Sequence, residues 1–365
     1  MRAALLESGR TPLQIVDDIA VRDPGPGEVV VRVQHCGICH SDLTIVDSEA
    51  PAPVPVVLGH EAAGTVQAVG AGVRTVSPGD HVVLVAVAPC GHCYWCVRGE
   101  PTCCQEARSF MSGRLPDGST SLSRGGQPVY RGLGVGGFGE LVLTTGNAVV
   151  KIDDDVPLEV AAVIGCAVQT GIGAVLNTAR VEEGATVLVM GLGGIGISVV
   201  QGARLAGASR IIVSDPVAER RDLAAKFGAT DALDPAEHDV VAACHRITRF
   251  GVDYAFDAAG SARLLEAGLS ATRTGGTTVS VGAPSAEETM TIAPAVRLLV
   301  EEKKLVGCLY GSGNATREVP RILSMWRRGV VDLESMISFQ RPLVEINDGF
   351  ADLRAGRGIR TVLSL

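Results

Sequence analysis

The chain has 365 residues, which exceeds what one ordinary hydrophobic core supports and indicates about two domains. Apolar residues make up 46% and charged residues 20%, a balance that excludes a disordered chain. A net charge of −8 and an aromatic content of 4% argue against a nucleic-acid-binding surface, which needs excess basic charge and stacking side chains.

The first third of the chain predicts a β domain. Residues 29–33, 64–69 and 81–85 read as short strands, and glycine or proline turns separate them. Many short strands with frequent turns are typical of a barrel-like domain. Residues 105–137 are rich in glycine and polar residues and predict a long surface excursion.

From about residue 166 the pattern alternates between strand and helix, which predicts a doubly wound parallel sheet. The expected strands are 186–190, 210–214, 252–256, 277–281 and 305–309, and the expected helices are 195–205 and 218–227. The tail from about residue 310 returns to mixed character and ends in a strand at 361–363. A nucleotide-fold domain between two parts of a β domain is the simplest arrangement.

The apolar runs and the N-terminus predict a cytoplasmic protein without a membrane partner. Residues 1–9 contain Glu7 and lack a run of signal-peptide length. The most apolar candidate, 185–200, contains four glycines of a turn and falls short of the ~20 apolar residues of a membrane helix. In the cytoplasm thiols stay reduced, so clustered cysteines indicate metal binding or chemistry.

A glycine loop predicts a dinucleotide site. The residues Gly191, Gly193, Gly194, Ile195 and Gly196 lie in a G-x-G-x-x-G pattern after an apolar strand and before a helix. Such glycines allow a tight turn and a close approach of the backbone to a pyrophosphate at the helix N-terminus. Asp215 ends the next strand, where a carboxylate accepts both ribose hydroxyls and favours NAD over NADP. Arg220 argues mildly the other way, because it would meet a 2′-phosphate.

Four cysteines predict a structural zinc site. Cys90, Cys93, Cys96 and Cys104 follow a C-x₂-C-x₂-C-x₇-C pattern within a lobe at about 89–105. Four thiolates suit tetrahedral Zn²⁺, and a site closed in this way stabilises a lobe without catalysing. Cys103 is the alternative to Cys104, and the spacing favours Cys104.

A second set of metal-binding side chains is spread along the chain. Cys39, His60 and Cys166 supply two thiolates and an imidazole. Three protein ligands leave the fourth position on Zn²⁺ open, which is what a catalytic zinc site requires.

In these motifs and their order the chain resembles the zinc-dependent medium-chain alcohol dehydrogenases over nearly its whole length. The resemblance implies that Cys39, His60 and Cys166 hold catalytic zinc, that Asp42 orients His60, and that Glu61 lies behind the metal as a transient ligand. It implies a GroES-like β-barrel catalytic domain at 1–167 with 310–365, a Rossmann domain at 168–309, and an active site in the cleft between them. Relatives associate through the last strand of the nucleotide sheet, so a homodimer or homotetramer is expected.

The resemblance also implies roles in the reaction, in which zinc polarises an alcohol and hydride passes to NAD. Ser41 is expected to hydrogen-bond the alcohol oxygen and to pass its proton toward the nicotinamide ribose. Many relatives continue this relay to a histidine where this chain has Thr44, so water is the alternative for the last step. The remaining residues expected at the cofactor are His40, Thr170, Val281 and Arg360.

The substrate is less well defined by sequence. Ala50 and Ala86 are small at pocket positions, which favours a bulky primary alcohol such as an aryl or allylic one. Arg108 matches an anion-binding arginine of glutathione-dependent formaldehyde dehydrogenases, so a thiol adduct is an alternative, although those enzymes have an acidic residue at the position of Ala50. A nicotinoprotein that keeps NAD bound is a further alternative, and a non-catalytic zinc- and NAD-binding sensor is disfavoured.

Overall fold

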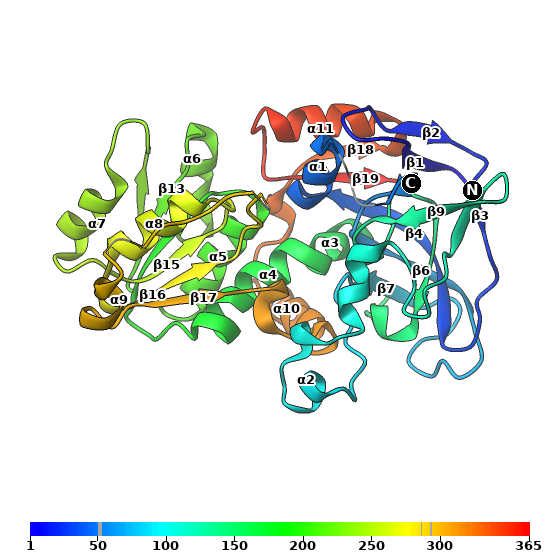
Figure 1. Ribbon diagram of the computed structural model, residues 1–365, viewed down its shortest axis with the longest axis horizontal. Coiled ribbons are helices and arrows are strands. Elements are labelled where there is room, and N and C mark those ends of the chain that lie inside the picture. The colour runs from blue at the N-terminus through cyan, green and yellow to red at the C-terminus, as the bar shows by residue number, and fades with distance from the viewer. Residues whose placement is uncertain (50–52, 286, 293) are drawn as a thin grey trace. The chain divides into compact units, whose positions relative to one another are not determined.

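The computed structural model describes residues 1–49, 53–285, 287–292 and 294–365. These residues form two compact units. Unit 1 comprises Met1–Cys166, Gly313–Arg327 and Leu333–Leu365, and unit 2 comprises Ala167–Ser312 and Arg328–Asp332. The chain therefore builds most of unit 1, then unit 2, and then returns to unit 1, as the colours of Figure 1 follow.

Unit 1 is dominated by β-strands. Its strands are β1 (Ala3–Leu6), β2 (Gln14–Val16), β3 (Ala20–Val21), β4 (Glu28–Ile38), β5 (Val56–Val57), β6 (Glu61–Val69), β7 (His81–Leu84), β8 (Leu122–Arg124), β9 (Gln127–Arg131), β10 (Leu141–Thr145), β11 (Val149–Lys151), β18 (Ile337–Pro342) and β19 (Arg360–Ser364). Its helices are α1 (His40–Asp47), α2 (Tyr94–Val97), α3 (Leu158–Val163), α10 (Ala315–Arg327) and α11 (Ile346–Arg354). The strands form one sheet in the order β2-β1-β5-β9-β8-β3 and another in the order β11-β7-β6-β4-β19-β18, with β10 also on β4.

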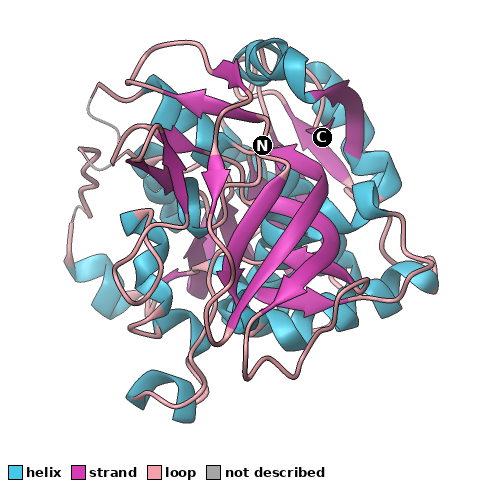
Figure 2. Ribbon diagram, turned by 90° about the vertical axis from the view of Figure 1, so that its right-hand side faces the viewer, coloured by secondary structure: helices cyan, strands magenta, loops and turns pink. Residues whose placement is uncertain are grey.

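The long strand β4 organises the second sheet. It pairs antiparallel with β6 along its length, with β10 near its beginning and with β19 near its end. The C-terminal strand is thereby placed directly against the N-terminal part of the chain, and Figure 2 shows both termini among the strands of this unit. The side chains of Val29, Val31 and Val33 alternate along β4 and are buried in the main core of unit 1. Phe138 and Phe350 join the same core, where their rings meet edge to face with centroids 6.1 Å apart.

The segment 105–137 differs from its prediction as a surface excursion. It contains the hairpin β8–β9, which is closed by Gly125 and Gly126, both at positive φ. β9 also pairs in parallel with β5, so the hairpin is part of the first sheet of unit 1. These strands are too short and too polar to show an alternating apolar pattern, so the sequence does not predict them. Their pairing with strands more than fifty residues away stabilises them.

Unit 2 is the predicted doubly wound domain. Its strands are β12 (Thr186–Met190), β13 (Arg210–Ser214), β14 (Asp231–Leu233), β15 (Val252–Asp257), β16 (Thr272–Ser280) and β17 (Lys304–Gly307). Its helices are α4 (Gln169–Gly173), α5 (Gly194–Leu205), α6 (Ala218–Phe227), α7 (Val240–Thr248), α8 (Ala262–Ala271) and α9 (Val296–Val300). The strands are parallel and lie in the order β14-β13-β12-β15-β16-β17, which is the 3-2-1-4-5-6 order of the Rossmann fold.

One helical stretch among the described residues is long and apolar enough to cross a membrane, from Leu158 to Ala179, and 89% of its most apolar window is buried inside the protein. A core helix passes the same test of length and composition. Residues 185–200, the predicted most apolar segment, instead form β12, the glycine loop and part of α5. The helix contains a π-helical turn at Ile164–Val168 that includes Cys166.

Candidate active site and metal centres

The structure brings together the side chains that the sequence predicts for a catalytic metal. One ligand atom from each of Cys39, His60, Glu61 and Cys166 lies within 4.8 Å of every other. Cys39 directly precedes α1, His60 directly precedes β6, and Cys166 lies in the π-helical turn. π-Helical turns are rare and frequent at functional sites. All four residues belong to unit 1 and are at most 9% exposed, so unit 1 alone assembles this cluster.

Asp42 holds the imidazole of His60. Its Oδ1 lies 3.2 Å from His60 Nδ1 and accepts the Gly59 N–H at 3.0 Å, while its Oδ2 accepts the Cys39 N–H at 3.3 Å. Asp42 is fully buried in the first turn of α1. This contact directs Nδ1 to the carboxylate and leaves Nε2 for a metal, which is the usual arrangement around a zinc-binding histidine.

The charges of the cluster are strongly coupled. A hydrogen bond from the Cys166 thiol, assisted by the Arg360 and His60 cations, holds the pKa of Cys39 well below its usual range despite burial. The same hydrogen bond and burial raise the pKa of Cys166. Burial lowers the pKa of His60, but the charges of Asp42 and Cys39 outweigh burial and raise it overall. Without a cation the cluster therefore shares protons among its members, and a divalent cation would replace those protons.

Glu61 and Arg360 form a buried pair behind the cysteines. Arg360 Nη2 lies 3.2 Å from Glu61 Oε1 and 3.9 Å from Cys39 Sγ, and both residues of the pair are at most 5% exposed. Burial outweighs the arginine charge and raises the pKa of Glu61 to about 7. Neither carboxylate oxygen accepts a hydrogen bond from any described residue, so apart from its ion pair with Arg360 the Glu61 carboxylate remains available to a metal ion. Soft thiolates, an imidazole and a spare carboxylate suit zinc.

The relay residues lie on α1 beside this cluster. Ser41 Oγ is 3.8 Å from Cys39 Sγ, and the Ser41 side chain is partly exposed. Thr44 Oγ1 donates its proton to the His40 carbonyl at 3.0 Å, one helical turn earlier. In this arrangement the Thr44 hydroxyl donates its only proton to the His40 carbonyl, so it can only accept a further hydrogen bond.

The second group of cysteines is the predicted lobe. Ligand atoms of Cys90, Cys93, Cys96 and Cys104 lie within 4.8 Å of one another, and Cys103 is not a member of the group. The Sγ atoms of Cys93 and Cys96 are 3.6 Å apart, and those of Cys90 and Cys96 are 4.0 Å apart. Thiolates at ~2.3 Å from a tetrahedral Zn²⁺ stand about 3.8 Å from each other, so the spacing fits zinc.

His92 does not extend this zinc group. Its Nδ1 lies 3.0 Å from the Cys90 carbonyl and its Nε2 lies 3.4 Å from Glu106, with both side chains exposed. A grouping of Cys90, His92 and Glu106 therefore overlaps the cysteine site and is engaged in local contacts. His92 is thus a loop residue on the lobe.

The glycine loop of unit 2 has the geometry of a dinucleotide site. Gly191 follows β12 at a φ of +90°, and Gly193 caps α5. A Cβ at Gly196 would lie 1.8 Å from the Gly191 carbonyl oxygen, so the loop closes only with glycine there. Asp215 accepts the Leu192 N–H at 2.6 Å, which fixes its carboxylate beside the loop.

Comparisons with known proteins are consistent with this geometry. Residues 25–154 match the alcohol dehydrogenase GroES-like domain, and residues 194–326 match the zinc-binding dehydrogenase domain. The chain is 39% identical to S-(hydroxymethyl)glutathione dehydrogenase of Escherichia coli O157:H7, over 99% of both chains. The chain belongs to the zinc-dependent medium-chain alcohol dehydrogenase family.

Solved structures of this family superpose on the whole chain. Benzyl alcohol dehydrogenase from Acinetobacter calcoaceticus is 32% identical with a TM-score of 0.94, and the match covers 100% of this chain and 99% of that one. A zinc-binding dehydrogenase from Sinorhizobium meliloti, 28% identical with a TM-score of 0.82 over 100% of this chain and 99% of that one, has NADP bound. The predicted fold, a GroES-like domain with a Rossmann domain, is confirmed, and zinc and a nicotinamide dinucleotide are the cofactors of the family.

The structure also places the other residues that the sequence predicts for the cofactor. Arg360 contacts the metal cluster, and its expected contact with a cofactor phosphate stays a prediction. Thr170 is buried in α4, Val281 is buried after β16, and Arg220 lies in α6. Arg221, which the sequence analysis did not select, donates to the Asp215 carbonyl at 2.6 Å.

Two of the three predicted pocket residues belong to the described part of the chain. Ala86 lines a cavity in unit 1, whereas Arg108 is exposed and is not part of that lining. Ala50 lies outside the described residues. The cavity is instead lined by Arg131, a buried residue of β9 that no sequence motif marked.

Proposed function

We propose that the protein is a zinc- and NAD-dependent alcohol dehydrogenase that converts a bulky primary alcohol, aryl or allylic, to its aldehyde and back. The observation that carries the proposal is the buried set of Cys39, His60 and Cys166 with Asp42 behind the imidazole. Three protein ligands with an oriented histidine leave one position for a substrate oxygen.

The chain's own residues divide the work of the reaction. Cys39, His60 and Cys166 would hold a zinc ion, which would supply Lewis-acid polarisation of the alcohol oxygen, and bound NAD would supply the hydride acceptor. Ser41 is suitably close to the cluster to take the alcohol proton, since its hydroxyl both accepts and donates. Thr44 can pass a proton on only after its own bond to the His40 carbonyl breaks, so a water molecule completes the relay. Glu61, with a pKa of about 7, is a spare carboxylate for the metal.

The cofactor is proposed to be NAD. The buried Asp215 carboxylate beside the glycine loop would repel the 2′-phosphate of NADP. The residues proposed to surround NAD are His40, Thr170, Gly191, Gly193, Gly194, Ile195, Gly196, Asp215, Arg220, Val281 and Arg360. The catalytic domain is proposed to span 1–167 with 310–365, and the NAD-binding domain 168–309.

Formaldehyde bound to a thiol is the second candidate substrate. The observation that favours it is the 39% identity to S-(hydroxymethyl)glutathione dehydrogenase of E. coli, which is higher than the 32% identity to the benzyl alcohol dehydrogenase. Arg108 is exposed and therefore accessible to an anionic thiol such as glutathione.

Turnover by the full-length zinc-loaded protein distinguishes these candidates. NADH formation is measured with NAD and ethanol, benzyl alcohol, cinnamyl alcohol, or formaldehyde plus glutathione. We expect the highest kcat/KM with the two aryl alcohols. A higher value with formaldehyde plus glutathione would establish the second candidate, and NADH that copurifies without turnover would establish a nicotinoprotein.

A cysteine variant tests the metal assignment. Cys166→Ala is expected to abolish turnover and to lower the zinc content from two ions to one per chain, while NAD binding to unit 2 persists. Cys36→Ala is the matched control, because Cys36 is a buried free cysteine outside both metal groups. Turnover retained by Cys166→Ala would refute the catalytic site.

Association into a homodimer or homotetramer is proposed through β17. This strand lies at the edge of the parallel sheet, and Leu305 and Leu309 are 37% and 49% exposed. The nearby Leu299 of α9 is 78% exposed. An unpaired strand edge beside exposed leucines is the kind of surface that pairs with a second copy.

The ten free cysteines support a reducing compartment, the cytoplasm.

A further inference from the structure

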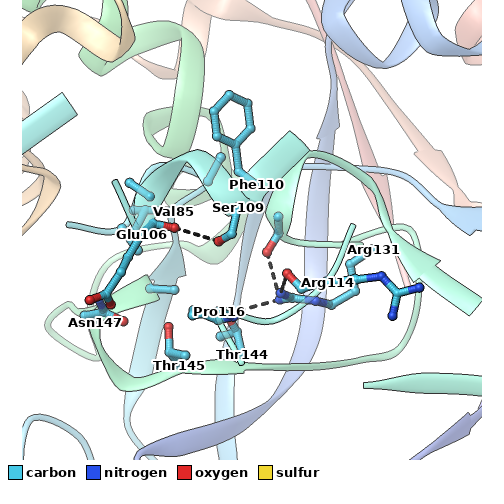
Figure 3. A pocket seen from close by; sticks show the side chains of 15 residues that line it. Val85, Glu106, Ser109, Phe110, Arg114, Pro116, Arg131, Thr144, Thr145 and Asn147 are labelled. Atoms are coloured by element: carbon cyan, nitrogen blue, oxygen red, sulfur yellow. Dashed lines mark hydrogen bonds between the residues drawn. The ribbon is translucent and has the colours of Figure 1, made fainter. Parts of the chain in front are cut away.

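A small polar cavity lies in unit 1, and none of its lining residues is among those proposed to hold catalytic zinc. It has a volume of about 30 Å³. Its lining includes Arg131, Thr144, Ser109 and Asn147, as Figure 3 shows, and its members all come from 85–148. A cavity of this size holds one small ion or about two water molecules. Asn147 is exposed at the rim, which gives the cavity access to solvent.

Arg131 is the unusual member of this lining. It is 3% exposed, and its guanidinium donates only to neutral oxygens. Nη1 donates to the Gly134 carbonyl at 2.8 Å and to the Leu143 carbonyl and Thr144 Oγ1 at 3.3 Å, and Nη2 donates to the Arg114 carbonyl at 3.2 Å. Its Nε–H is buried and has no acceptor among the described residues.

The positive charge of Arg131 also lacks a direct counter-ion. Burial lowers its pKa to about 10, so it remains protonated at neutral pH. No carboxylate of the described residues lies within ion-pair distance of it, although Glu28 attracts it from further away. Glu28 is itself held by both guanidinium nitrogens of Arg22 at 2.6 Å. Burying a cation beside neutral acceptors alone is costly unless an anion accompanies it.

The Glu106 carboxylate of the lining does not fill this role. It is exposed, and its Oε1 lies 3.4 Å from His92 Nε2 on the zinc lobe. The Thr144 hydroxyl, by contrast, accepts from Arg131 and keeps its own proton for another acceptor. The cavity thus offers a buried cation, an unused N–H and a hydroxyl donor around a space the size of a small ion.

We propose that this cavity is a binding site for a small monovalent anion, chloride or formate, held by Arg131 with the Thr144 hydroxyl. The anion would neutralise the buried guanidinium and would stabilise the packing of β9 against β10 and the Arg114 segment. The site is independent of the proposed alcohol substrate, since the residues that hold the anion do not belong to the metal cluster.

The test uses the full-length zinc-loaded protein in a chloride-free gluconate buffer at constant ionic strength. Sodium chloride or sodium formate replaces sodium gluconate stepwise, and both Tm and the chloride NMR linewidth are followed. Because a ligand that binds only the folded state stabilises it by mass action, Tm is expected to rise as chloride or formate binds and saturates the site. Gluconate is too large for the cavity and serves as the reference. A Tm that does not change when chloride or formate replaces gluconate would mean that the cavity holds water only.

Variants locate the site. Thr144→Val and Arg131→Gln are expected to weaken chloride binding by about tenfold or more, since each removes a buried donor. Arg2→Gln is the matched control, because Arg2 is an exposed arginine of the same unit. Thr144→Val keeps the test decisive if Arg131→Gln does not fold.

A metal-site variant separates this cavity from zinc, which also attracts anions. In Cys39→Ser the chloride response is expected to persist, because Cys39 does not line the cavity. A response that is lost in Cys39→Ser and retained in Thr144→Val would place the anion at the metal and overturn the proposal.

Discussion

The carboxylate behind His60 offers the sharpest test of the proposed zinc site. Replacing Asp42 with asparagine preserves the size of the side chain and one acceptor oxygen. That oxygen can still accept from His60 Nδ1 and the Gly59 N–H, the two contacts of Oδ1. The other position becomes an NH₂ group that faces the Cys39 N–H, where Oδ2 now accepts at 3.3 Å. The substitution therefore removes the negative charge beside His60 and the hydrogen bond from the backbone N–H of Cys39, a proposed zinc ligand.

The size of the effect follows from these contacts. A hydrogen bond to a charged group contributes roughly 1.5–3 kcal/mol and a neutral one roughly 0.5–1.5 kcal/mol. Losing the charge at His60 and the contact at Cys39 thus costs about 1–3 kcal/mol of metal-binding free energy. That range corresponds to roughly a 10–100-fold loss of zinc affinity, in line with other residues that orient zinc ligands.

Chelator competition measures this loss directly. Wild-type protein and Asp42→Asn are titrated with a zinc chelator, and retained zinc is determined per chain. We expect the catalytic zinc ion to leave Asp42→Asn at a free chelator concentration about 10–100-fold lower than for the wild type. The cysteine lobe is expected to keep its zinc ion. Asp47→Asn is the matched control, because Asp47 lies at the other end of α1 and forms an exposed pair with Arg354.

The proposed role of Asp42 in orienting His60 is wrong if Asp42→Asn folds as the wild type does and binds both zinc ions within twofold of the wild-type affinity. That outcome would mean that His60 keeps its orientation without the carboxylate. Loss of both ions together would mean that the variant disturbs unit 1 as a whole, and circular dichroism would then reveal the change in fold.

Three further predictions follow from single positions. Cys93→Ser is expected to remove zinc from the lobe and to lower Tm by several degrees, at ~2–4 °C per kcal/mol. Cys103 lies outside the zinc group, so Cys103→Ser is the control and should leave Tm unchanged. Equal Tm values for the two variants would argue against the lobe site. Gly196→Ala is expected to abolish NAD binding measured by calorimetry, because the added Cβ would lie 1.8 Å from the Gly191 carbonyl oxygen. Gly307→Ala is the control, because a Cβ added at Gly307 would meet no atom within 4 Å. Leu305→Lys is expected to shift the protein toward the monomer in light scattering, and an unchanged mass would exclude β17 as the interface.

Local motifs could be predicted from the sequence because their partners are near neighbours. The glycine loop follows β12 and opens α5 at the predicted positions, and each lobe cysteine is at most eight positions from the next member of its set. Asp215, predicted as the end of its strand, directly follows β13. In each case a turn or a strand end fixes the side chain, so spacing alone carries the information.

Features that depend on distant pairing were not accessible in the same way. Arg360 reaches Glu61 because both β19 and β6 pair with the end of β4, a register that no local pattern encodes. Cys166 joins the cluster through a π-helical turn within an apolar helix. Arg131 has no motif, because its role comes from carbonyl oxygens that three separate segments present to it. The sequence contains these residues, but only tertiary structure selects their partners.

The position of β19 has a consequence for synthesis of the chain. β19 comprises five residues, Arg360–Ser364; it pairs with β4 near its end and brings Arg360 to Glu61 in the buried metal cluster. A nascent chain that has completed unit 2 still has an open edge on β4 and a buried carboxylate, Glu61, without its cation. Such an edge invites pairing with other chains. The buried pair of Glu61 with Arg360 therefore forms only after β19 has been synthesised, and a variant without β19 would leave this carboxylate without its arginine.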